Sequence, residues 1–396
     1  MPQCHDLSLP LYYLGDSQYY LSMAQGNYGS VVSPFSKRFL WPLLARGVDK
    51  IGHLGLPASF LALNIMAFAL LAWCVAACLE VTTGSPWLAV LLLLTPLPLD
   101  SLQLAYMPDL FHMALIALFF LLLLREKIWP ALLVLLVAFA ARESTLLLCV
   151  ACGLSGWLRR QRPLWLGSLA VLLLGTLLTT RFAALAQPNL HKLPEIVYLP
   201  LKLVYNFLLN FLGIAIRTNV TPIGHPATMH KLPAFLRFGA DTEFGISFDW
   251  RFPASTLVIL LTVFGSGPIF LFRFLRRNLA LSAPWPIQLA FFYGAVCFLI
   301  GPCLGNCADR LAGYGWPVFW IALPALLKRT GFQTTRRDLI ILVSCFVLIC
   351  WYPRLAGFWL ENLERTKNPL PSLVVLVPYI ITLVLTQRGA DVKRET

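Results

Sequence analysis

Long apolar runs separated by short polar loops limit most strongly what this chain can fold into. One run extends over 54–79 and another over 340–351. A helix needs about 20 apolar residues to cross about 30 Å of hydrocarbon. Because lipid offers no partner to an unpaired backbone N–H or C=O group, such runs are expected to be helices rather than strands of an open sheet. The sequence therefore predicts an all-α, polytopic transmembrane fold.

The composition favours the same class. Of the 396 residues, 58% are hydrophobic and 12% are charged, and that charged share is about half that of a soluble domain. A soluble fold of this composition would expose a large apolar surface. Most of the cysteines lie in apolar runs, including Cys149 and Cys152. There a thiol is expected to pack as a small hydrophobic side chain rather than to bind zinc or form a redox pair.

About eleven spans are predicted from the apolar runs, with boundaries soft by several residues. The predicted spans are 55–79, 86–105, 109–124, 128–141, 144–158, 163–183, 254–275, 284–303, 311–327, 338–353 and 370–386. For the short pair 128–141 and 144–158, the alternative is a helical hairpin that does not cross completely. All of them are expected to belong to one transmembrane domain, 1–396.

That domain is expected to have four consecutive parts. These are a first external loop with an amphipathic segment (1–54), the N-terminal helices (55–183), an external loop with an interfacial helix (184–253), and the C-terminal helices with a cytoplasmic tail (254–396).

Basic residues predict the orientation. Of the 31 Lys and Arg residues, 15 lie in five segments that alternation of the spans places on one side. These segments are Arg125–Lys127, Arg159–Arg162, Arg273–Arg277, Lys328–Arg337 and Arg388–Arg394. Cytoplasmic loops are rich in Lys and Arg, so this side is expected to be cytoplasmic. The same rule accounts for the net charge of +13. No basic run alternates with exposed aromatic residues, so nucleic-acid binding is not expected.

Two segments decide whether the alternation of the spans agrees with the placement of the basic residues. The apolar stretch Tyr198–Ile216 carries Lys202, Asn206 and Asn210, and it is expected to lie along the interface. As a true span it would move the 273–277 basic segment to the outside. At the N-terminus, Asp16 would be external with no span before it, so an upstream first helix is expected in the natural product, with a chain that starts outside as the alternative.

Charged residues gather at three places on the predicted external side. The first is Asp16 with Tyr19, followed by the amphipathic stretch 34–44, which contains Arg38. Such a segment is suited to the headgroup plane of a bilayer. The second is Asp109, in a very short turn between two spans. The third is a pair of helix-end arginines that each adjoin a carboxylate, and these residues are Arg142, next to Glu143, and Arg310, next to Asp309.

This arrangement resembles the GT-C superfamily of integral-membrane glycosyltransferases. Members carry a catalytic Asp or Glu in a long first external loop, often in a Gly-Asp…Tyr setting, and a second acidic residue in the short external turn two spans later. Asp16 matches the first position and Asp109 the second. The stretch from Pro34 to Leu44 looks like the Pro-Phe…Arg…Leu-x-Pro-Leu element of many bacterial members. The resemblance covers 15–160 by motif and the rest by helix layout, and the absent first helix is its one departure.

The resemblance implies transfer of a sugar, with inversion, from a polyprenyl-phosphate carrier to a glycan, lipid or protein acceptor. The protein would then lie among the lipids of a bacterial inner (plasma) membrane with its active site facing outward. Asp16 would be the general base that deprotonates the acceptor hydroxyl. Asp109 would position the acceptor, or hold a divalent cation where the family uses one, and no other cofactor is implied.

The donor phosphate requires cationic partners. Arginine suits this task because its planar fork of N–H groups matches phosphate oxygens. Arg142 and Arg310 are therefore expected to hold the phosphate. The remaining substrate-binding residues are expected to be Arg38, Glu143 and Tyr19.

Each site residue also has a structural interpretation. Aspartate is a good N-cap, so Asp16 is a candidate cap for a helix that begins at the next residue. Asp109 is a candidate first-turn residue, stabilised by the helix dipole. Arg142 and Glu143 are candidates for an ion pair with each other. Arg310 is a candidate partner of the neighbouring aspartate, or a side chain that reaches along the helix to the interface.

Two other functions compete with glycosyl transfer. One is a transporter or flippase for a lipid-linked or anionic substrate, although transporters tend to have related halves and helices broken near mid-membrane. The other is a non-catalytic assembly subunit, for which external acidic residues need not converge. Only the enzyme requires Asp16 and Asp109 around one external cavity that a lipid can reach.

Overall fold

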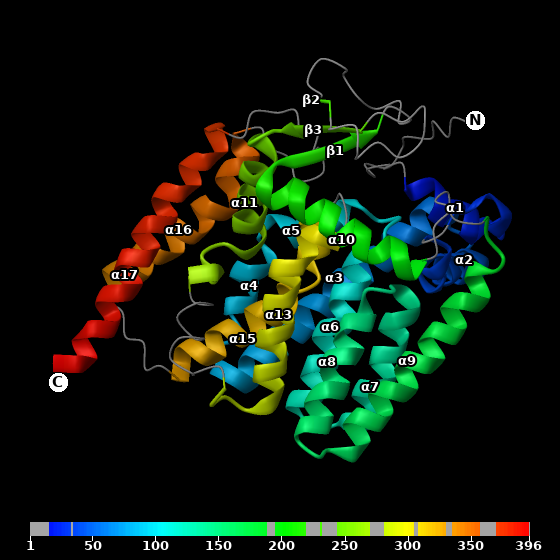
Figure 1. Cartoon of the computed structure of the whole chain (residues 1–396). Coiled ribbons are helices and arrows are strands. Elements are labelled where there is room, and N and C mark those ends of the chain that lie inside the picture. The colour runs from blue at the N-terminus through cyan, green and yellow to red at the C-terminus, as the bar shows by residue number, and fades with distance from the viewer. Residues whose placement is uncertain are drawn as a thin grey trace. The chain divides into compact units, whose positions relative to one another are not determined.

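The computed structural model describes residues 16–32, 35–187, 195–218, 230–231, 244–269, 281–304, 308–329, 335–356 and 370–395. The chain forms two compact units. Unit 1 comprises Met1–Lys192, Phe270–Ala295 and Tyr314–Phe332, and unit 2 comprises Leu193–Ile269, Val296–Gly313 and Gln333–Thr396. Helices dominate the described part of both units, which confirms the predicted helical class (Figure 1).

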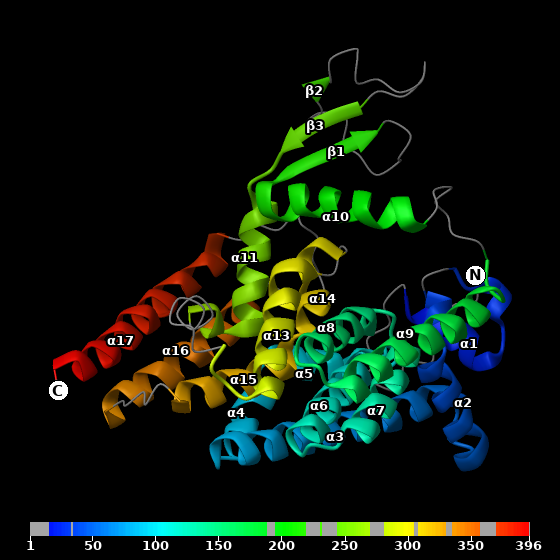
Figure 2. The same ribbon diagram turned by 60° about the horizontal axis from the view of Figure 1, so that its bottom comes forward.

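The regular elements described in unit 1 are helices, and an isolated parallel bridge joins Val32 and Gln187. Its helices are α1 (Ser17–Gln25), η1 (Tyr28–Ser30), η2 (Phe35–Lys37), α2 (Leu40–Gly52), α3 (Leu56–Thr83), α4 (Leu88–Leu93), α5 (Pro96–Gln103), α6 (Asp109–Leu124), α7 (Ile128–Ala141), α8 (Thr145–Leu158), α9 (Arg162–Ala183), the first half of α13 (Trp285–Leu304) and α15 (Trp316–Arg329). Helices α6, α7, α8 and α9 lie side by side (Figures 1 and 2).

Helix α6 is the centre of unit 1. Beyond Asp109 and His112 in its first turn it is apolar on all sides, and its buried residues include Leu110, Ile116 and Phe120. A helix that is hydrophobic all round must be covered by others, and α6 is packed by α3, α7 and α15. The neighbouring contact of α7 with α9 is close because α9 presents a glycine: a Cβ added at Gly175 would lie 2.6 Å from the ring of Phe139. Small residues allow such close helix approach in membrane proteins.

Four helices in the described part of the chain are long and apolar enough to cross a membrane, judged by length and composition. They are α3, α9, α13 and α16 (Arg336–Leu355), and shorter apolar helices occur at α6, α7, α8, α11 (Arg251–Phe264) and Leu370–Thr386. These helices support the predicted membrane character. The count of eleven spans stays a prediction.

The predicted span 86–105 is wrong as a single helix. The structure breaks it into α4 and α5, with Thr95 between them in an extended conformation (φ −69°, ψ 157°). Thr95 precedes Pro96, and a residue before proline is pushed out of the helical region by the proline ring. Leu94 ends the first piece, and the proline begins the second.

Unit 2 combines helices with a small sheet. Its elements are α10 (Glu195–Leu212), β1 (Ile214–Thr218), β2 (His230–Lys231), β3 (Phe244–Phe248), α11, the second half of α13, α14 (Ala308–Gly313), α16, η5 (Leu370–Val375) and α17 (Leu376–Glu395). The sheet is antiparallel with strand order β1-β3-β2. It lies within the segment predicted as an external loop, where no strand was predicted, and α10 leads directly into it (Figure 2).

The helix predicted over Tyr198–Ile216 is present as α10 but ends earlier than expected, and its location along the interface stays a prediction. Gly213 has a left-handed φ of 69°, a conformation that favours glycine, and β1 follows it. Asn206 and Asn210 are buried and donate to the carbonyl oxygens of Cys303 (3.0 Å) and Pro302 (2.6 Å). These carbonyls lie in the last turn of α13, where a helix leaves its C=O groups without intrahelical partners.

Some predictions fall outside the described residues. They include the start of the amphipathic stretch at Pro34, the basic segment Arg273–Arg277 and the residues before Asp16. The described part of that stretch is η2 and the beginning of α2, and α2 buries Trp41 and Ala45. Its position in a headgroup layer stays a prediction.

Topology can be tested by cysteine labelling. In a background without reactive native cysteines, a membrane-impermeant maleimide added from outside is expected to label Asp241→Cys and to leave Arg160→Cys unlabelled, because the positive-inside rule places the 159–162 turn in the cytoplasm. After permeabilisation both positions should react. External labelling of position 160 without labelling of position 241 would reverse the orientation.

Candidate active site

Asp109 is the centre of a buried polar cluster in unit 1. It begins α6 directly after Pro108 and is 3% exposed. Its Oδ1 accepts a hydrogen bond from Nη1 of Arg142 at 2.7 Å and another from the hydroxyl of Tyr314 at 3.0 Å. Arg142 ends α7 with an extended backbone, and its guanidinium carbon lies 4.5 Å from the centre of the Tyr314 ring.

These contacts indicate how Asp109 is used. A carboxylate oxygen has two lone pairs, and both lone pairs of Oδ1 are engaged by Arg142 and Tyr314. At Oδ1 the arrangement therefore holds the guanidinium of Arg142 in a fixed orientation. The role predicted for Asp109, which is to position the acceptor, stays a prediction.

A second ion pair lies beside the first. Arg38 follows η2, and its guanidinium holds both carboxylate oxygens of Glu143: Nε lies 2.8 Å from Oε2, and Nη2 lies 2.5 Å from Oε1. Nη1 of Arg38 donates to the hydroxyl of Tyr20 at 3.0 Å. The Arg38 side chain is 10% exposed and that of Glu143 is 32% exposed. Such bidentate pairs are among the stronger charge-assisted contacts in proteins.

The pKa values of this group follow from the pairing. Burial by itself would raise the pKa of Glu143, but the charge and hydrogen bonds of Arg38 outweigh it and lower that pKa to about 2. Burial would lower the pKa of Arg38, and Glu143 reverses the shift and raises it well above the ordinary value. Burial raises the pKa of Tyr20, and the positive charge of Arg38 offsets this rise only in part. Arg38 and Glu143 are therefore charged at neutral pH, and Tyr20 is neutral.

The two ion pairs form one continuous network. Arg142 and Glu143 are consecutive residues in the turn between α7 and α8, and each pairs with a residue from elsewhere in the chain. The charges of Arg142 and Asp109 also act on Tyr20. The interpretation of Arg142 and Glu143 as an ion pair with each other is therefore wrong, because Asp109 and Arg38 take those places.

His112 extends the network by one turn along α6. Its Nε2 lies 2.9 Å from the hydroxyl of Thr145 at the start of α8. Its ring meets the ring of Tyr314 edge-on, with centroids 5.0 Å apart. Residues three apart on a helix share a face, so His112 and Asp109 point toward the same surroundings. Both are buried.

Asp16 precedes α1, the helix that brings Tyr20 into the network. It occupies the N-cap position with a helical backbone (φ −71°, ψ −23°), and its side chain makes no capping hydrogen bond. The predicted cap position of Asp16 is therefore confirmed, but not the capping hydrogen bond of its side chain. Residues four apart lie on one helix face, so Asp16 and Tyr20 share a face of α1. Tyr19, by contrast, stacks on Phe35 with ring centroids 4.7 Å apart.

Arg310 belongs to unit 2, whereas the residues of the polar network belong to unit 1. It lies in α14 of unit 2 and is 7% exposed. Its expected role toward the donor phosphate stays a prediction. Among the residues that the structure describes, no three His, Cys, Asp or Glu side chains gather as a metal site would require.

Sequence reasoning missed four residues of the network: Tyr20, His112, Thr145 and Tyr314. Tyr20 had a usable signal, since it follows Asp16 by one helical turn. His112 had a weaker one, because it follows Asp109 by three residues on an apolar helix, where polar side chains are rare and usually functional. Tyr314 lies 205 residues from Asp109 and had none.

The partly buried ion pair of Glu143 with Arg38 predicts a pH dependence of stability. A carboxylate whose pKa is lowered by folding stabilises the fold fully above its unfolded pKa, about 4.3, and this contribution is lost as the pH falls toward the folded pKa, which is about 2. As the pH is lowered between those two pKa values, the melting temperature of the detergent-solubilised protein is expected to decrease. The decrease should depend on Glu143. Glu143→Gln should be less stable at neutral pH and show a shallower fall, whereas equal slopes for both proteins would contradict the pairing.

No protein-family model, no curated protein and no solved structure matches the chain.

Proposed function

We propose that this protein is a membrane glycosyltransferase of the GT-C type that moves a sugar from a polyprenyl-phosphate carrier to an acceptor. The observation that carries the proposal is the buried network in which Asp109, Arg142 and Tyr314 adjoin Arg38 and Glu143. Ionisable side chains among apolar helices are costly and commonly mark substrate or ion sites. About eleven spans, an outward-facing site and a bacterial plasma membrane belong to the same proposal.

The proposed reaction is a single displacement. Asp16 accepts the proton of the acceptor hydroxyl as its oxygen forms a bond to the anomeric carbon of the sugar. The bond from that carbon to the phosphate oxygen breaks on the opposite face, and the polyprenyl phosphate leaves with the electron pair. The anomeric configuration is therefore inverted. Asp16 suits the role of base because it is half-buried at the start of α1, one turn before a residue of the network.

The arginines are proposed to stabilise the phosphate as it leaves. A guanidinium has five N–H donors, and the described hydrogen bond of Arg142 to Asp109 uses Nη1. Other donors of the same group are then suited to phosphate oxygens. Because Asp109 and Tyr314 already hold this guanidinium in place, little reorganisation is needed when charge develops on the leaving group. Arg38, held by Glu143 and Tyr20, is proposed to act beside it, and Arg310 and Tyr19 are further proposed substrate contacts.

The experiment that tests this function follows the fate of the carrier. Purified protein in proteoliposomes is given polyprenyl-phosphate-linked hexoses and pentoses together with membrane extract as a source of glycan, lipid or protein acceptors. The proposal expects free polyprenyl phosphate to appear in step with a labelled product. A transporter or flippase would instead move the intact sugar carrier across the bilayer without consuming it. Neither consumption nor movement is expected of an assembly subunit.

A further inference from the structure

A second candidate site lies in unit 1 outside the polar network. It is a pocket of about 580 Å³ where the ends of α3, α6 and α15 meet the start of α13. Its lining residues are Val81, Thr82, Leu123, Leu124, Glu126, Pro284, Trp285, Pro286, Ile287, Ala325, Lys328 and Arg329. The two cations come from the last turn of α15.

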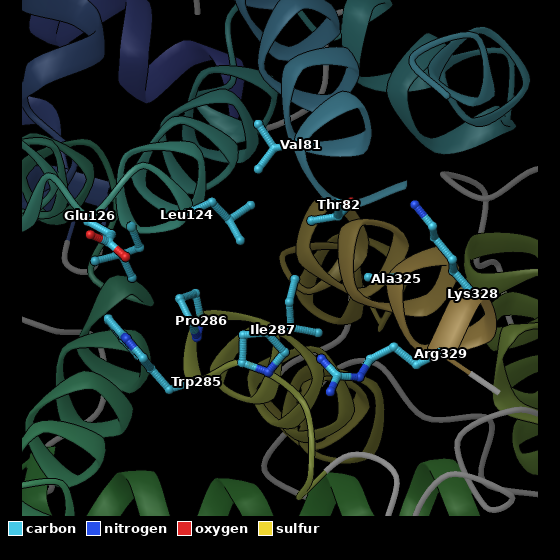
Figure 3. Close-up of a pocket in the computed structure, with 12 residues that line it drawn as sticks. Val81, Thr82, Leu124, Glu126, Trp285, Pro286, Ile287, Ala325, Lys328 and Arg329 are labelled. Carbon is cyan, nitrogen blue, oxygen red and sulfur yellow. The ribbon is translucent and has the colours of Figure 1, made fainter. Parts of the chain in front are cut away.

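The walls of this pocket are of two kinds. Apolar side chains such as Val81, Leu124 and Ile287 line its middle, while Lys328 and Arg329 lie on one side and Glu126 on the opposite side (Figure 3). A cavity that joins an apolar surface to a basic edge matches a ligand with an acidic head and a hydrocarbon tail.

The two cations are available to such a head group. Nζ of Lys328 donates to the backbone oxygen of Thr83 at 3.1 Å, and Nη2 of Arg329 donates to the backbone oxygen of Ser282 at 3.1 Å. Both described partners are neutral carbonyl groups, so they orient the cations without neutralising them. A lysine has three donors and an arginine five, which leaves further N–H groups for a phosphate. Both side chains are exposed.

The position of the pocket at the ends of the helices also favours a ligand with an acidic head and a hydrocarbon tail. α3 and α13 are two of the helices long and apolar enough to cross a membrane, and the pocket forms where α3 ends and α13 begins. Helix ends of this kind lie at the headgroup level, where tryptophan is also enriched; Trp285 is the first residue of α13. The predicted orientation makes this the cytoplasmic end, and the cytoplasmic leaflet carries anionic lipids that basic pockets between helices bind.

We propose that this pocket binds an anionic phospholipid of the cytoplasmic leaflet. Its phosphate would contact Lys328 and Arg329, and an acyl chain would lie against Val81, Leu124 and Ile287. The charge of the two basic residues provides selectivity over zwitterionic lipids, and the apolar wall provides selectivity over free phosphate. This site does not depend on the proposed sugar transfer.

The test compares lipid binding by wild-type protein and a charge variant. Delipidated protein in neutral detergent is titrated with phosphatidylglycerol or phosphatidylcholine, and bound lipid is counted by native mass spectrometry. Because each basic residue near a headgroup strengthens the attraction to an anionic lipid, the double variant Lys328→Gln/Arg329→Gln is expected to bind phosphatidylglycerol roughly tenfold or more weakly. Phosphatidylcholine binding should not change. The matched control is Arg336→Gln/Arg337→Gln, which removes the same charge from exposed positions at the start of α16.

A second readout locates the lipid. Phosphatidylglycerol with brominated acyl chains is expected to quench Trp285, measured as the fluorescence lost in wild type but not in Trp285→Phe. Glycerol phosphate and inorganic phosphate should bind at least tenfold more weakly than the lipid. The proposal is overturned if both lipids bind alike, if the charge variant retains phosphatidylglycerol, if inorganic phosphate competes equally, or if Trp285 is not quenched.

Discussion

Asp16→Asn is expected to lower the rate of sugar transfer by roughly 10²–10⁴-fold, the usual contribution of general-base catalysis. Asparagine keeps the shape and hydrogen-bonding capacity of the side chain but cannot accept the proton of the acceptor hydroxyl. Because asparagine has nearly the same size and shape as aspartate, folding should persist. Initial rates of polyprenyl phosphate release measure the effect, and the melting temperature confirms the fold.

Two further variants make this result specific. Asp16→Glu keeps a carboxylate on a longer side chain, so it should retain more activity than Asp16→Asn. Asp49→Asn makes the same chemical change at a half-buried position of α2 and should leave the rate close to wild type. A full rate for Asp16→Asn would remove Asp16 from the chemistry, and an equal loss for Asp49→Asn would show that the change acts through general destabilisation.

Breaking the Asp109–Arg142 ion pair is expected to have the largest effect on stability. Both side chains are 4% exposed and lie 2.7 Å apart. Removing one partner of a buried pair leaves the other charge uncompensated, which costs about 3–5 kcal/mol. Asp109→Ala and Arg142→Ala should each lose stability of that order, while the double variant should lose much less than the sum. Unfolding free energies in a denaturant titration of the solubilised protein measure the coupling.

The chain contains a second Asp–Arg pair that serves as a matched comparison for this double-mutant cycle. Arg251 and Asp249 also form an Asp–Arg pair at 2.6 Å, but their side chains are 40% and 21% exposed. Solvent-accessible pairs contribute about 0–1 kcal/mol, so the same double-mutant cycle should give a small coupling there. Similar couplings at both sites would show that burial does not set the strength of the Asp109–Arg142 interaction.

The helices could be predicted from the sequence largely because they are apolar along their whole length. α6, α7 and α8 have the predicted bounds to within a residue. The errors arise where local backbone chemistry interrupts an apolar run, as before Pro96, or where partners lie far apart in sequence. β1 pairs with β3 through contacts such as Ile214 with Phe248, and neither segment shows alternation strong enough to predict this pairing.

The residues of the site could be predicted better than their partners. Asp109, Arg142, Arg38 and Glu143 are conspicuous because charges are rare in this chain, and the structure brings all four together. Which arginine faces which carboxylate depends on how the α7–α8 turn meets α6 and the residues after η2. Adjacent residues in an extended segment point to opposite sides, so Arg142, which is extended, and Glu143 take different partners.

The most direct test of the central claim is a structure of the protein with a bound polyprenyl phosphate. Phosphate density is expected within hydrogen-bond distance of Arg142 or Arg38. The Asp16 and Asp109 carboxylates are expected to lie within about 10 Å of each other, since inverting carboxylate pairs are spaced at about 6.5–9.5 Å. A phosphate bound away from both arginines, with Asp16 directed into solvent far from Asp109, would contradict it.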